Sequence, residues 1–330
     1  MTVVLAVDAG GTSTRAVVVD HTGRCLGLAR SGGGNPISSG PDQAAAALAG
    51  SAGAALSAAG ISPAAVEVVL LAVAGAGSPT HRGALTQRLA GLTDRPVFAS
   101  DLLATFCSGT HRPDGYALIG GTGAAAIRVE RGRQSAVADG LGWLLGDEGS
   151  GFSIGHRVAR AALADLDGRG PATTLTGALR ARLSVPAELA AREAAEAITR
   201  SLYAALPVRL ADLAALAFDA AGDPVADGIV ADAAQDLATT LRAVTSSDVA
   251  GPVVVGGGVL SNSVALREAA LAAYAGQGPA PEAVVVRDGT VGTAVLALRH
   301  AGATVDEQVF RTLTTSIAAE PEPAPPAEPR

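Results

Sequence analysis

The sequence contains no lysine, so all 24 of its basic side chains are arginine. The phosphate-binding motif G-x-x-x-x-G-K-[ST] is therefore excluded, and so is a protein-kinase site, because both need a lysine ammonium group. Aromatic residues make up only 3% of the chain, whereas hydrophobic residues make up 48% and charged residues 17%. This composition is typical of a folded globular protein whose core is built from Val, Leu and Ala.

Cysteines and basic charge are also sparse. Two cysteines, Cys25 and Cys107, cannot form a disulfide framework and suit a reducing compartment. The net charge of −7, without an Arg-rich run, argues against a nucleic-acid partner, and the five histidines lack the spacing of zinc ligands. No apolar run has transmembrane length. The N-terminal apolar run is not preceded by basic residues and is interrupted by Asp8, so we do not expect a signal peptide. We therefore expect a cytoplasmic protein with no membrane partner.

At 330 residues the chain is longer than one hydrophobic core usually accounts for, which predicts two domains. The opening segment "VVLAVDAGGTSTRAVVVD" predicts two paired strands joined by Gly10-Gly11-Thr12, and "YALIGGTGAAAIRV" repeats that pattern around Gly120-Gly121-Thr122. This internal duplication predicts two related α/β halves. We expect the halves at residues 1–113, rejoined by a helix at about 291–318, and at residues 114–290, with a disordered tail over 319–330.

The remaining elements follow from periodicity and turn residues. We expect a strand near residues 25–29, a loop over 30–41, helices over 42–59 and from Ser78-Pro79, and a helix after Asp101. Further expected elements are strands within 66–75, 96–100 and 282–288, a mainly helical insertion from 151 to about 247, and a strand, glycine turn and helix over 252–263.

The glycine turns are the candidate nucleotide site. Glycine at a hairpin tip permits positive φ and lets an anion approach successive backbone N–H groups. We predict that the two hairpin tips bind phosphate and that the third glycine turn admits a flat base, although each is also explained as a plain turn. Asp8 is expected to hold Mg²⁺ through water, which this ion readily keeps. The predicted nucleotide-binding residues are Gly10, Gly11, Thr12, Ser13, Gly121, Thr122, Gly123, Gly257 and Gly258.

Six segments of the chain occur together in a known order. They are "DAGGTSTRAVVVD", "GGGNP", "ASDLLA", "LIGGTGA", "GLGWLLGDEGSG" and "VVVGGGV", over residues 8 to 258. With them the chain resembles the superfamily of actin, the sugar kinases and the heat-shock ATPases, and more narrowly the N-acetylglucosamine kinase-like, BadF/BadG/BcrA/BcrD ATPase family. The resemblance implies two ribonuclease-H-like (actin-like ATPase) domains with a cleft between them that closes over ATP and a hexosamine. Phosphates held by backbone hairpins and Mg²⁺ need no lysine.

The resemblance also implies roles for individual residues. Asp101 matches the catalytic aspartate, which accepts the proton of the sugar 6-hydroxyl as that oxygen attacks the γ-phosphorus. Asn35 and Asp147 match sugar-binding positions, and Gly140 and Gly142 match backbone that lines the sugar. The structural alternatives are a helix N-cap for Asp101 and an Asn-Pro turn for Asn35. For Asp147 the alternative is a favourable charge at a helix N-terminus.

One departure from the family pattern leaves the substrate open. The family often has Gly-Trp-Gly where this chain has Gly140-Leu141-Gly142, so that Leu141 joins the predicted sugar-binding residues, and Trp143 comes one place late. Trp143 either compensates or packs in the core. Glucosamine, N-acetylglucosamine and N-acetylmuramic acid therefore all remain candidate substrates.

Two functions other than a kinase are compatible with parts of the sequence. The family includes ATPases that activate acyl-CoA dehydratases through a subunit-bridging iron–sulfur cluster, but Cys25 and Cys107 lie in no cluster-like motif. A non-catalytic amino-sugar sensor is the second alternative, and the presence of both Asp101 and Asp147 favours catalysis over it. We therefore predict an amino-sugar kinase that uses ATP and Mg²⁺, and the family expectation is a homodimer.

Overall fold

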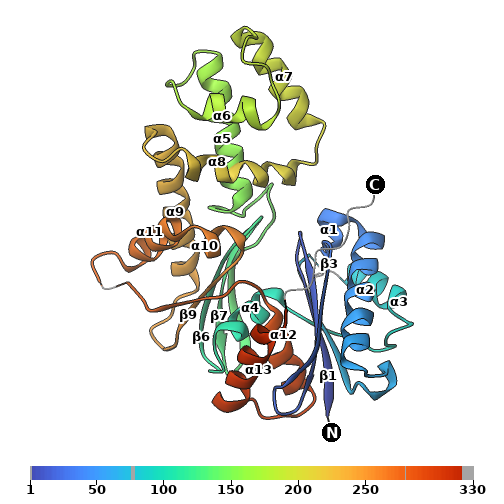
Figure 1. Ribbon diagram of the computed structural model, residues 1–330. Helices are drawn as coiled ribbons and strands as arrows, with labels where there is room; N and C mark the ends of the chain where they lie inside the picture. Colours follow the sequence, from blue (N-terminus) through green and yellow to red (C-terminus); the bar gives the residue numbers. More distant parts are fainter. Residues whose placement is uncertain (1, 76–78, 279, 322–330) are drawn as a thin grey trace. The chain divides into compact units, whose positions relative to one another are not determined.

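The computed structural model describes residues 2–75, 79–278 and 280–321 of the chain (Figure 1). It divides into two compact units, described separately below. Unit 1 consists of Met1–Gly115, Val129–Gln134 and Val284–Arg330, and unit 2 of Tyr116–Arg128 and Ser135–Ala283. The sequence predicts boundaries at about residues 113 and 290, and unit 1 also includes the short segment Val129–Gln134, which the sequence did not predict.

Unit 1 is built on a mixed sheet of five strands in the order β3-β2-β1-β4-β5. Strands β1, β2 and β3 are antiparallel neighbours, whereas β1, β4 and β5 run parallel. The strands are β1 (Val3–Ala9), β2 (Thr14–Asp20), β3 (Cys25–Ser31), β4 (Val68–Val73) and β5 (Val97–Ala99). The helices of this unit are α1 (Pro36–Ser39), α2 (Pro41–Ala59), α3 (Pro79–Arg88), α4 (Asp101–Gly109), α12 (Thr290–His300) and α13 (Glu307–Ala319).

Helices cover both faces of this sheet. Leu5 and Val7 of β1 pack with Leu48 of α2 in one core cluster. Val4 and Ala6 point to the opposite face, because side chains alternate along a strand, and they are fully buried as well. Figure 1 shows α2 on one side of the blue strands and α4 and α12 on the other. A strand buried on both faces is apolar at nearly every position, which explains the run "VVLAV".

The second sheet has the order β10-β9-β6-β7-β8, with β6 and β9 parallel. Its strands are β6 (Gly115–Gly120), β7 (Ala124–Glu130), β8 (Arg133–Asp139), β9 (Val253–Gly256) and β10 (Ala283–Val285). In unit 2, Leu118 and Val255 of this sheet pack against Leu237 and Leu241 of α9. The helices are α5 (Gly151–Leu166), α6 (Leu175–Arg182), α7 (Ala191–Tyr203), η2 (Pro207–Leu213), α8 (Ala214–Asp219), α9 (Pro224–Val244), α10 (Gly258–Asn262) and α11 (Val264–Ala275).

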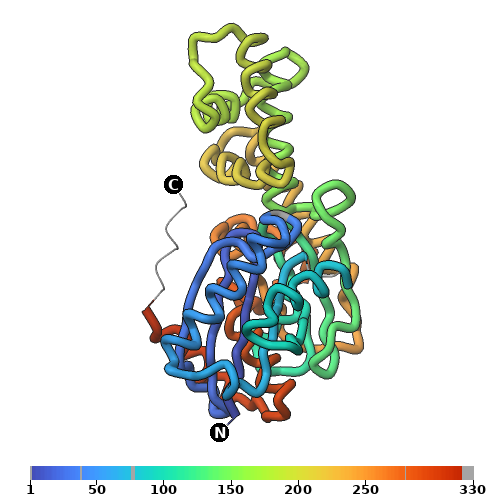
Figure 2. The backbone as a smooth tube through the Cα atoms, turned by 90° about the vertical axis from the view of Figure 1, so that its right-hand side faces the viewer, coloured from blue at the N-terminus to red at the C-terminus, as the bar shows by residue number. Residues whose placement is uncertain are grey.

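The helical insertion of unit 2 forms a small core of its own. Ala162 of α5, Leu179 of α6 and Ile198 of α7 are completely buried together. Figure 2 shows α6 and α7, in yellow-green, stacked beside the far end of α5. The prediction of a mainly helical stretch over this part of the chain is confirmed.

Other predictions differ from the structure in detail. Strand β8 was not predicted, and the loop expected at residues 30–41 contains the short helix α1. The single C-terminal helix is wrong: the chain forms α12 and α13 instead, separated by a turn at Gly302, whose φ is +81°. The expected capping hydroxyl of Ser78 and most of the expected tail, residues 322–330, lie outside the described residues.

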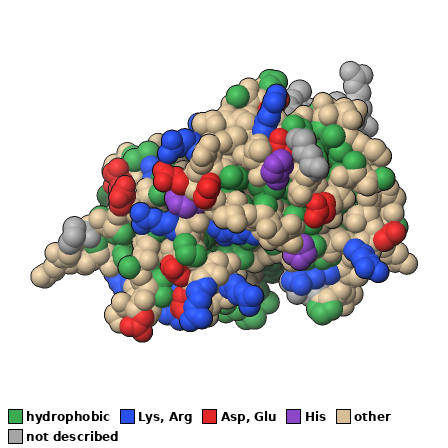
Figure 3. Space-filling model, turned by 90° about the horizontal axis from the view of Figure 1, so that it is seen from below, with side chains coloured by type: hydrophobic (Ala, Val, Ile, Leu, Met, Phe, Trp, Pro, Cys, Tyr) green, Lys and Arg blue, Asp and Glu red, His purple; other side chains and the backbone are tan. Residues whose placement is uncertain are grey.

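The surface and the helices show two further properties. On the face drawn in Figure 3, arginine and acidic side chains are interspersed. Within the described ranges, no single helix combines the length and apolarity needed to cross a bilayer. One bent pair of helices, Ala191–Tyr203 with Pro207–Asp219, has sufficient length and apolar composition when the two are taken together.

Candidate functional site

The first glycine hairpin joins β1 to β2 in unit 1. The Gly10 N–H donates to the Ser13 carbonyl at 2.9 Å, and the Gly10 carbonyl accepts from the N–H groups of Gly34 (3.0 Å) and Asn35 (3.1 Å). A Cβ at Gly33 would collide with the Gly11 carbonyl. The hairpin therefore rests directly on the "GGGNP" segment. Gly10 and Gly11 have no positive φ, so the left-handed backbone expected at this tip is not found, and the close approach that requires glycine occurs at Gly33.

Asp8 lies beside this hairpin, and two other aspartates of unit 1 affect its pKa. Asp8 Oδ2 accepts the N–H of Gly289 at 3.0 Å, and a Cβ at Gly289 would lie 2.6 Å from Asp8 Oδ1. Burial, followed by the nearby charge of Asp288, raises the pKa of Asp8 to about 7, and Asp101 adds to the increase. Asp8 is thus a carboxylate poorly compensated by its own protein, as expected of a group that awaits a cation.

Asp288 and Arg15 complete this arrangement, and the sequence had assigned no role to Asp288. Arg15 Nε lies 3.5 Å from Asp288 Oδ2, and the Arg15 guanidinium also donates to Ser13 Oγ at 3.3 Å. Asp288 Oδ1 accepts the Thr290 N–H at the start of α12. No local sequence signal marks this pair, because folding brings its members together from opposite ends of the chain.

Asp101 lies in the first turn of α4, directly after β5. The helix is capped by Ser100, whose Oγ accepts the Leu103 N–H at 3.4 Å, so the N-cap alternative for Asp101 is wrong. Burial raises the pKa of Asp101, and the N–H groups of Asp101 and Leu102 partly oppose this effect. A raised pKa makes the carboxylate a stronger general base.

The side chain of Asn35 has a structural role at the turn that it forms with Pro36. Its Oδ1 accepts the Ile37 N–H at 2.8 Å and thereby caps α1. Gly75, which follows β4 and has φ +78°, approaches Asn35 Oδ1 so closely that no Cβ would fit there. Among the described residues, the Asn35 amide NH₂ makes no hydrogen bond, and it remains as a donor at this edge of unit 1.

The second hairpin, Gly121–Gly123 between β6 and β7, is anchored differently. Its carbonyls accept N–H groups from the start of α5: Gly151 donates to Gly121 at 2.8 Å and Phe152 donates to Thr122 at 3.2 Å. Gly257, at the third glycine turn, has φ +87°, and its Cβ would lie 2.6 Å from the Gly120 carbonyl carbon. The predicted phosphate and base turns of unit 2 are therefore direct neighbours.

The carboxylate of Asp147 also lies on this hairpin. Its Oδ1 accepts the Ala124 N–H at 3.2 Å, and a Cβ at Gly123 would be 2.8 Å from Oδ2. Asp147 comes three residues before Ser150, the N-cap of α5, so its charge lies near the N-terminus of this helix, which is the structural alternative expected for it. Burial, and to a lesser degree the charges of Asp139 and Glu148, raise the pKa of Asp147.

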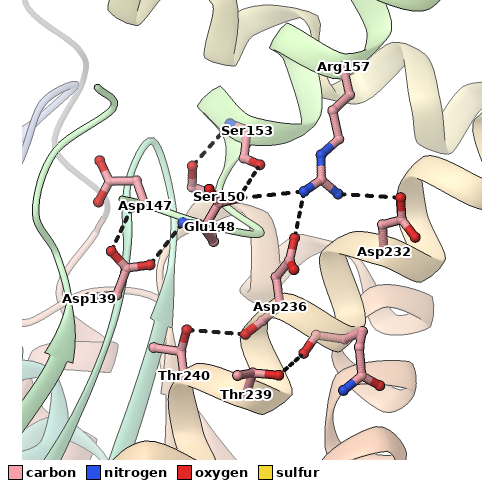
Figure 4. A network of polar contacts seen from close by, with 11 residues as sticks. Asp139, Asp147, Glu148, Ser150, Ser153, Arg157, Asp232, Asp236, Thr239 and Thr240 are labelled. Carbon is pink, nitrogen blue, oxygen red and sulfur yellow. Dashed lines mark hydrogen bonds and ion pairs between the residues drawn. The ribbon is translucent and has the colours of Figure 1, made fainter. Parts of the chain in front are cut away.

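Figure 4 shows the polar contacts around Asp147. The carboxylate of Asp139, which the sequence had not singled out, accepts the N–H groups of Asp147 (2.7 Å) and Glu148 (2.9 Å). Arg157 of α5 reaches Glu148 at 3.5 Å and Asp236 of α9 at 2.7 Å. The Asp-Gly pair at residues 139–140 was the available signal, because it is typical of turns.

The loop over residues 140–145 exposes its apolar side chains. Gly140 and Gly142 have φ +71° and +85°, and Leu141 between them is 68% exposed. Trp143 is 41% exposed and packs against Phe152 at a ring-centroid distance of 5.5 Å. Trp143 is thus not a core residue, which was one of the two roles considered for it.

The structure also bears on the predicted cofactors. The Nε of Arg128, which follows the second hairpin, donates a hydrogen bond to Ser135 Oγ. Both cysteines, Cys25 and Cys107, are buried. In the part of the chain that the structure describes, no group of three or more His, Cys, Asp or Glu side chains could hold a metal ion. Asp8 is an incompletely compensated carboxylate, and carboxylate oxygen is the ligand type that Mg²⁺ prefers.

Comparisons with known proteins identify the family of this chain. The model of the BadF/BadG/BcrA/BcrD ATPase family matches residues 5–297. The N-acetylmuramic acid/N-acetylglucosamine kinase of Clostridium acetobutylicum is 33% identical over 90 residues, 27% of this chain and 29% of that protein. The glucosamine kinase GspK of Vibrio cholerae is 33% identical over 178 residues, 52% of this chain and 58% of that protein. The alignments thus span less than two thirds of these relatives.

A solved structure extends the similarity over the whole fold. The crystal structure of a candidate N-acetylglucosamine kinase from Chromobacterium violaceum has a TM-score of 0.72 and 25% identity, and the match covers 90% of this chain and 99% of that one. The predicted fold class is confirmed: the two mixed five-stranded sheets with their helices form an actin-like ATPase fold. The chain is a distant homologue of N-acetylglucosamine and glucosamine kinases.

Proposed function

Because this chain belongs to the BadF/BadG/BcrA/BcrD ATPase family, we propose that it is an ATP-dependent amino-sugar kinase. It transfers the γ-phosphate of ATP to the 6-hydroxyl of N-acetylglucosamine or of a close relative such as glucosamine or N-acetylmuramic acid. One observation supports this proposal above the others. Asp101 is a half-buried residue whose carboxylate has a raised pKa and does not cap its helix, and it lies close enough to Asp8 to raise that pKa as well.

In this proposal the residues of unit 1 carry the proton transfer. Asp101 accepts the proton of the sugar hydroxyl as the oxygen attacks phosphorus, and Asn35 donates from its amide to a neighbouring hydroxyl. Asp8 holds the water ligands of Mg²⁺, and the N–H groups of Gly11, Thr12 and Ser13 contact phosphate. When bound, Mg²⁺ and ATP supply the phosphoryl group and neutralise part of its charge. No lysine is required.

The residues of unit 2 bind and orient the two substrates. The carboxylate of Asp147 accepts hydrogen bonds from sugar hydroxyls, and the backbone of Gly140 and Gly142 lines the sugar. The N–H groups of Thr122 and Gly123 contact phosphate, since that of Gly121 donates to the Gly123 carbonyl, and the Gly257–Gly258 turn contacts the adenine. A homodimer in the cytoplasm remains our prediction for the assembly and its location.

The direct test is ADP release from ATP and Mg²⁺ with glucosamine, N-acetylglucosamine, N-acetylmannosamine, N-acetylmuramic acid or glucose. We expect sugar-dependent ADP release with at least one amino sugar, and a product that carries phosphate on its 6-oxygen. Bound sugar without ADP would instead identify a sensor. Sugar-independent hydrolysis together with an iron–sulfur chromophore after anaerobic purification would identify a dehydratase activator.

A further inference from the structure

The loop that leads to Asp147 is closed at its base by one side chain. Asp139 is the last residue of β8, and each of its carboxylate oxygens accepts a backbone N–H: Oδ1 from Asp147 at 2.7 Å and Oδ2 from Glu148 at 2.9 Å (Figure 4). Hydrogen bonds to an ionised acceptor are stronger than neutral ones. The loop over residues 140–146 is therefore tied at both ends to one carboxylate.

The backbone around this contact is shaped to permit it. Asp139 and Asp147 both have φ near +60°, a conformation that non-glycine residues seldom adopt (61° and 60°). Gly146 approaches the Asp139 carboxylate so closely that a Cβ there would collide with it. Strain of this kind persists only where surrounding contacts maintain it.

Apolar burial contributes little to holding the loop. Leu141, Leu144 and Leu145 are 68%, 74% and 77% exposed, and Trp143, which packs against Phe152, is 41% exposed. The other restraints are backbone bonds, such as those that Leu145 and Gly146 donate to the Gly142 carbonyl, and the bond that the Gly142 N–H donates to the Asp147 carboxylate. The Asp139 carboxylate is thus the side-chain restraint that joins the two ends of the loop.

The same contact determines where Asp147 points. Its backbone N–H is bound to Asp139, while its side chain lies on the Gly123–Ala124 hairpin, with Oδ1 3.2 Å from the Ala124 nitrogen. Loss of the first contact would release the residue that makes the second. We propose that Asp139 is a positioning residue. It holds the two ends of the loop over residues 140–146 together and so sets the sugar-binding orientation of the Asp147 carboxylate. This proposal rests on the kinase function for the sugar-binding role of Asp147.

Two substitutions separate the carboxylate from the backbone shape. Asp139→Gly removes both acceptors, and glycine adopts positive φ without strain. Asp139→Asn keeps the shape, tolerates positive φ and retains one carbonyl oxygen for one of the two N–H groups. Asp114 provides the matched control, because its carboxylate accepts the Arg131 N–H at 2.7 Å within unit 1, whereas the loop belongs to unit 2.

The first measurement does not depend on activity. Trp143 is the only tryptophan of the chain and lies within the loop, so its fluorescence reports on the loop alone. We expect acrylamide to quench Asp139→Gly more strongly than wild type, Asp139→Asn to an intermediate degree, and Asp114→Asn as wild type. Quenching of Asp139→Gly equal to wild type would show that Asp139 does not hold the loop.

The second measurement is steady-state kinetics on the best amino sugar. We expect Asp139→Gly to raise the sugar KM roughly tenfold or more with a smaller change in kcat, since a lost charge-assisted bond loosens Asp147. Asp139→Asn should recover part of this loss, and the KM for ATP and the kinetics of Asp114→Asn should stay near wild type. An unchanged sugar KM, or an equal rise in Asp114→Asn, would overturn the proposal.

The two measurements also distinguish this proposal from the function on which it rests. If wild-type protein phosphorylates none of the sugars, the kinase function fails, and the quenching series alone decides whether Asp139 closes the loop. If wild type is active and the Asp139 variants behave as wild type in both measurements, the kinase function stands and the positioning role is wrong.

Discussion

The two Gly-Gly-Thr hairpins have the same local sequence and lie in very different surroundings. The hairpin of unit 1 is supported by backbone from the Gly32–Gly34 loop and lies beside the Asp8 and Asp288 carboxylates. The hairpin of unit 2 is bound by the start of α5 and by the Asp147 carboxylate itself. A repeated motif thus produces the same turn twice, while distant segments decide which chemistry each turn serves.

The largest difference between the two sides should appear in catalysis. In unit 1, Asp101→Asn keeps the size of the side chain and removes the base, so kcat should fall roughly 10²- to 10⁴-fold. In unit 2, Asp147→Asn should mainly raise the sugar KM, by about tenfold, because Asn binds hydroxyls less well than a carboxylate. Steady-state kinetics with matched melting curves tests both.

Asp94→Asn is a suitable control for these variants, because Asp94 is an exposed surface residue. It should keep wild-type kinetics. A folded Asp101→Asn protein with normal kcat would remove Asp101 from its catalytic role, and an Asp147→Asn protein with normal sugar KM would remove Asp147 from the sugar site.

The glycines of the two sides should differ next, this time in stability. Alanine at Gly257 meets the Gly120 carbonyl carbon at 2.6 Å in a left-handed backbone, which should destabilise the protein by about 3 kcal/mol. Alanine at Gly10 meets only the Ser13 oxygen at 3.7 Å, so stability should stay equal or rise by up to about 1 kcal/mol as the unfolded chain loses freedom. Denaturant unfolding of both variants tests the contrast, which equal effects would contradict.

A smaller effect concerns the charge of Asp8. Its pKa is about 7 in the folded protein and 3.8 as the reference value, so the unfolded state releases this proton first as pH rises. The folded state is therefore destabilised progressively between about pH 4 and pH 7, and the penalty is complete above that range. Asp8→Asn in metal-free buffer should gain stability over wild type between about pH 5 and pH 8. A stability difference independent of pH would show that the Asp8 pKa is not raised.

Local patterns predicted most of the fold. Both hairpins followed from β-branched runs around glycines, and the helical insertion from its Ala- and Leu-rich composition. Strand β8 was missed because most of its residues are exposed or half-buried and its sequence, "RQSAVAD", carries little apolar signal. The break between α12 and α13 was missed although Arg299, His300 and Gly302 form the basic last turn and following glycine that typically end a helix.

The candidate site was predictable only as far as motifs reach. Asp101, Asp147 and the glycine turns lie in recognisable segments, and the structure groups them within their units. Asp288 and Asp139 were missed, because their roles consist of contacts with Arg15 and with the backbone of Asp147 that only the folded chain creates. Such contacts leave no local pattern in a single sequence.

Hydrogen exchange with and without a nonhydrolysable ATP analogue and Mg²⁺ tests most directly whether two lysine-free hairpins bind the triphosphate. We expect peptides covering residues 8–15 and 119–126 to be protected together by the nucleotide, while the β8 peptide serves as an internal reference. Protection of one hairpin alone, or of neither despite bound nucleotide, would contradict phosphate binding by the pair.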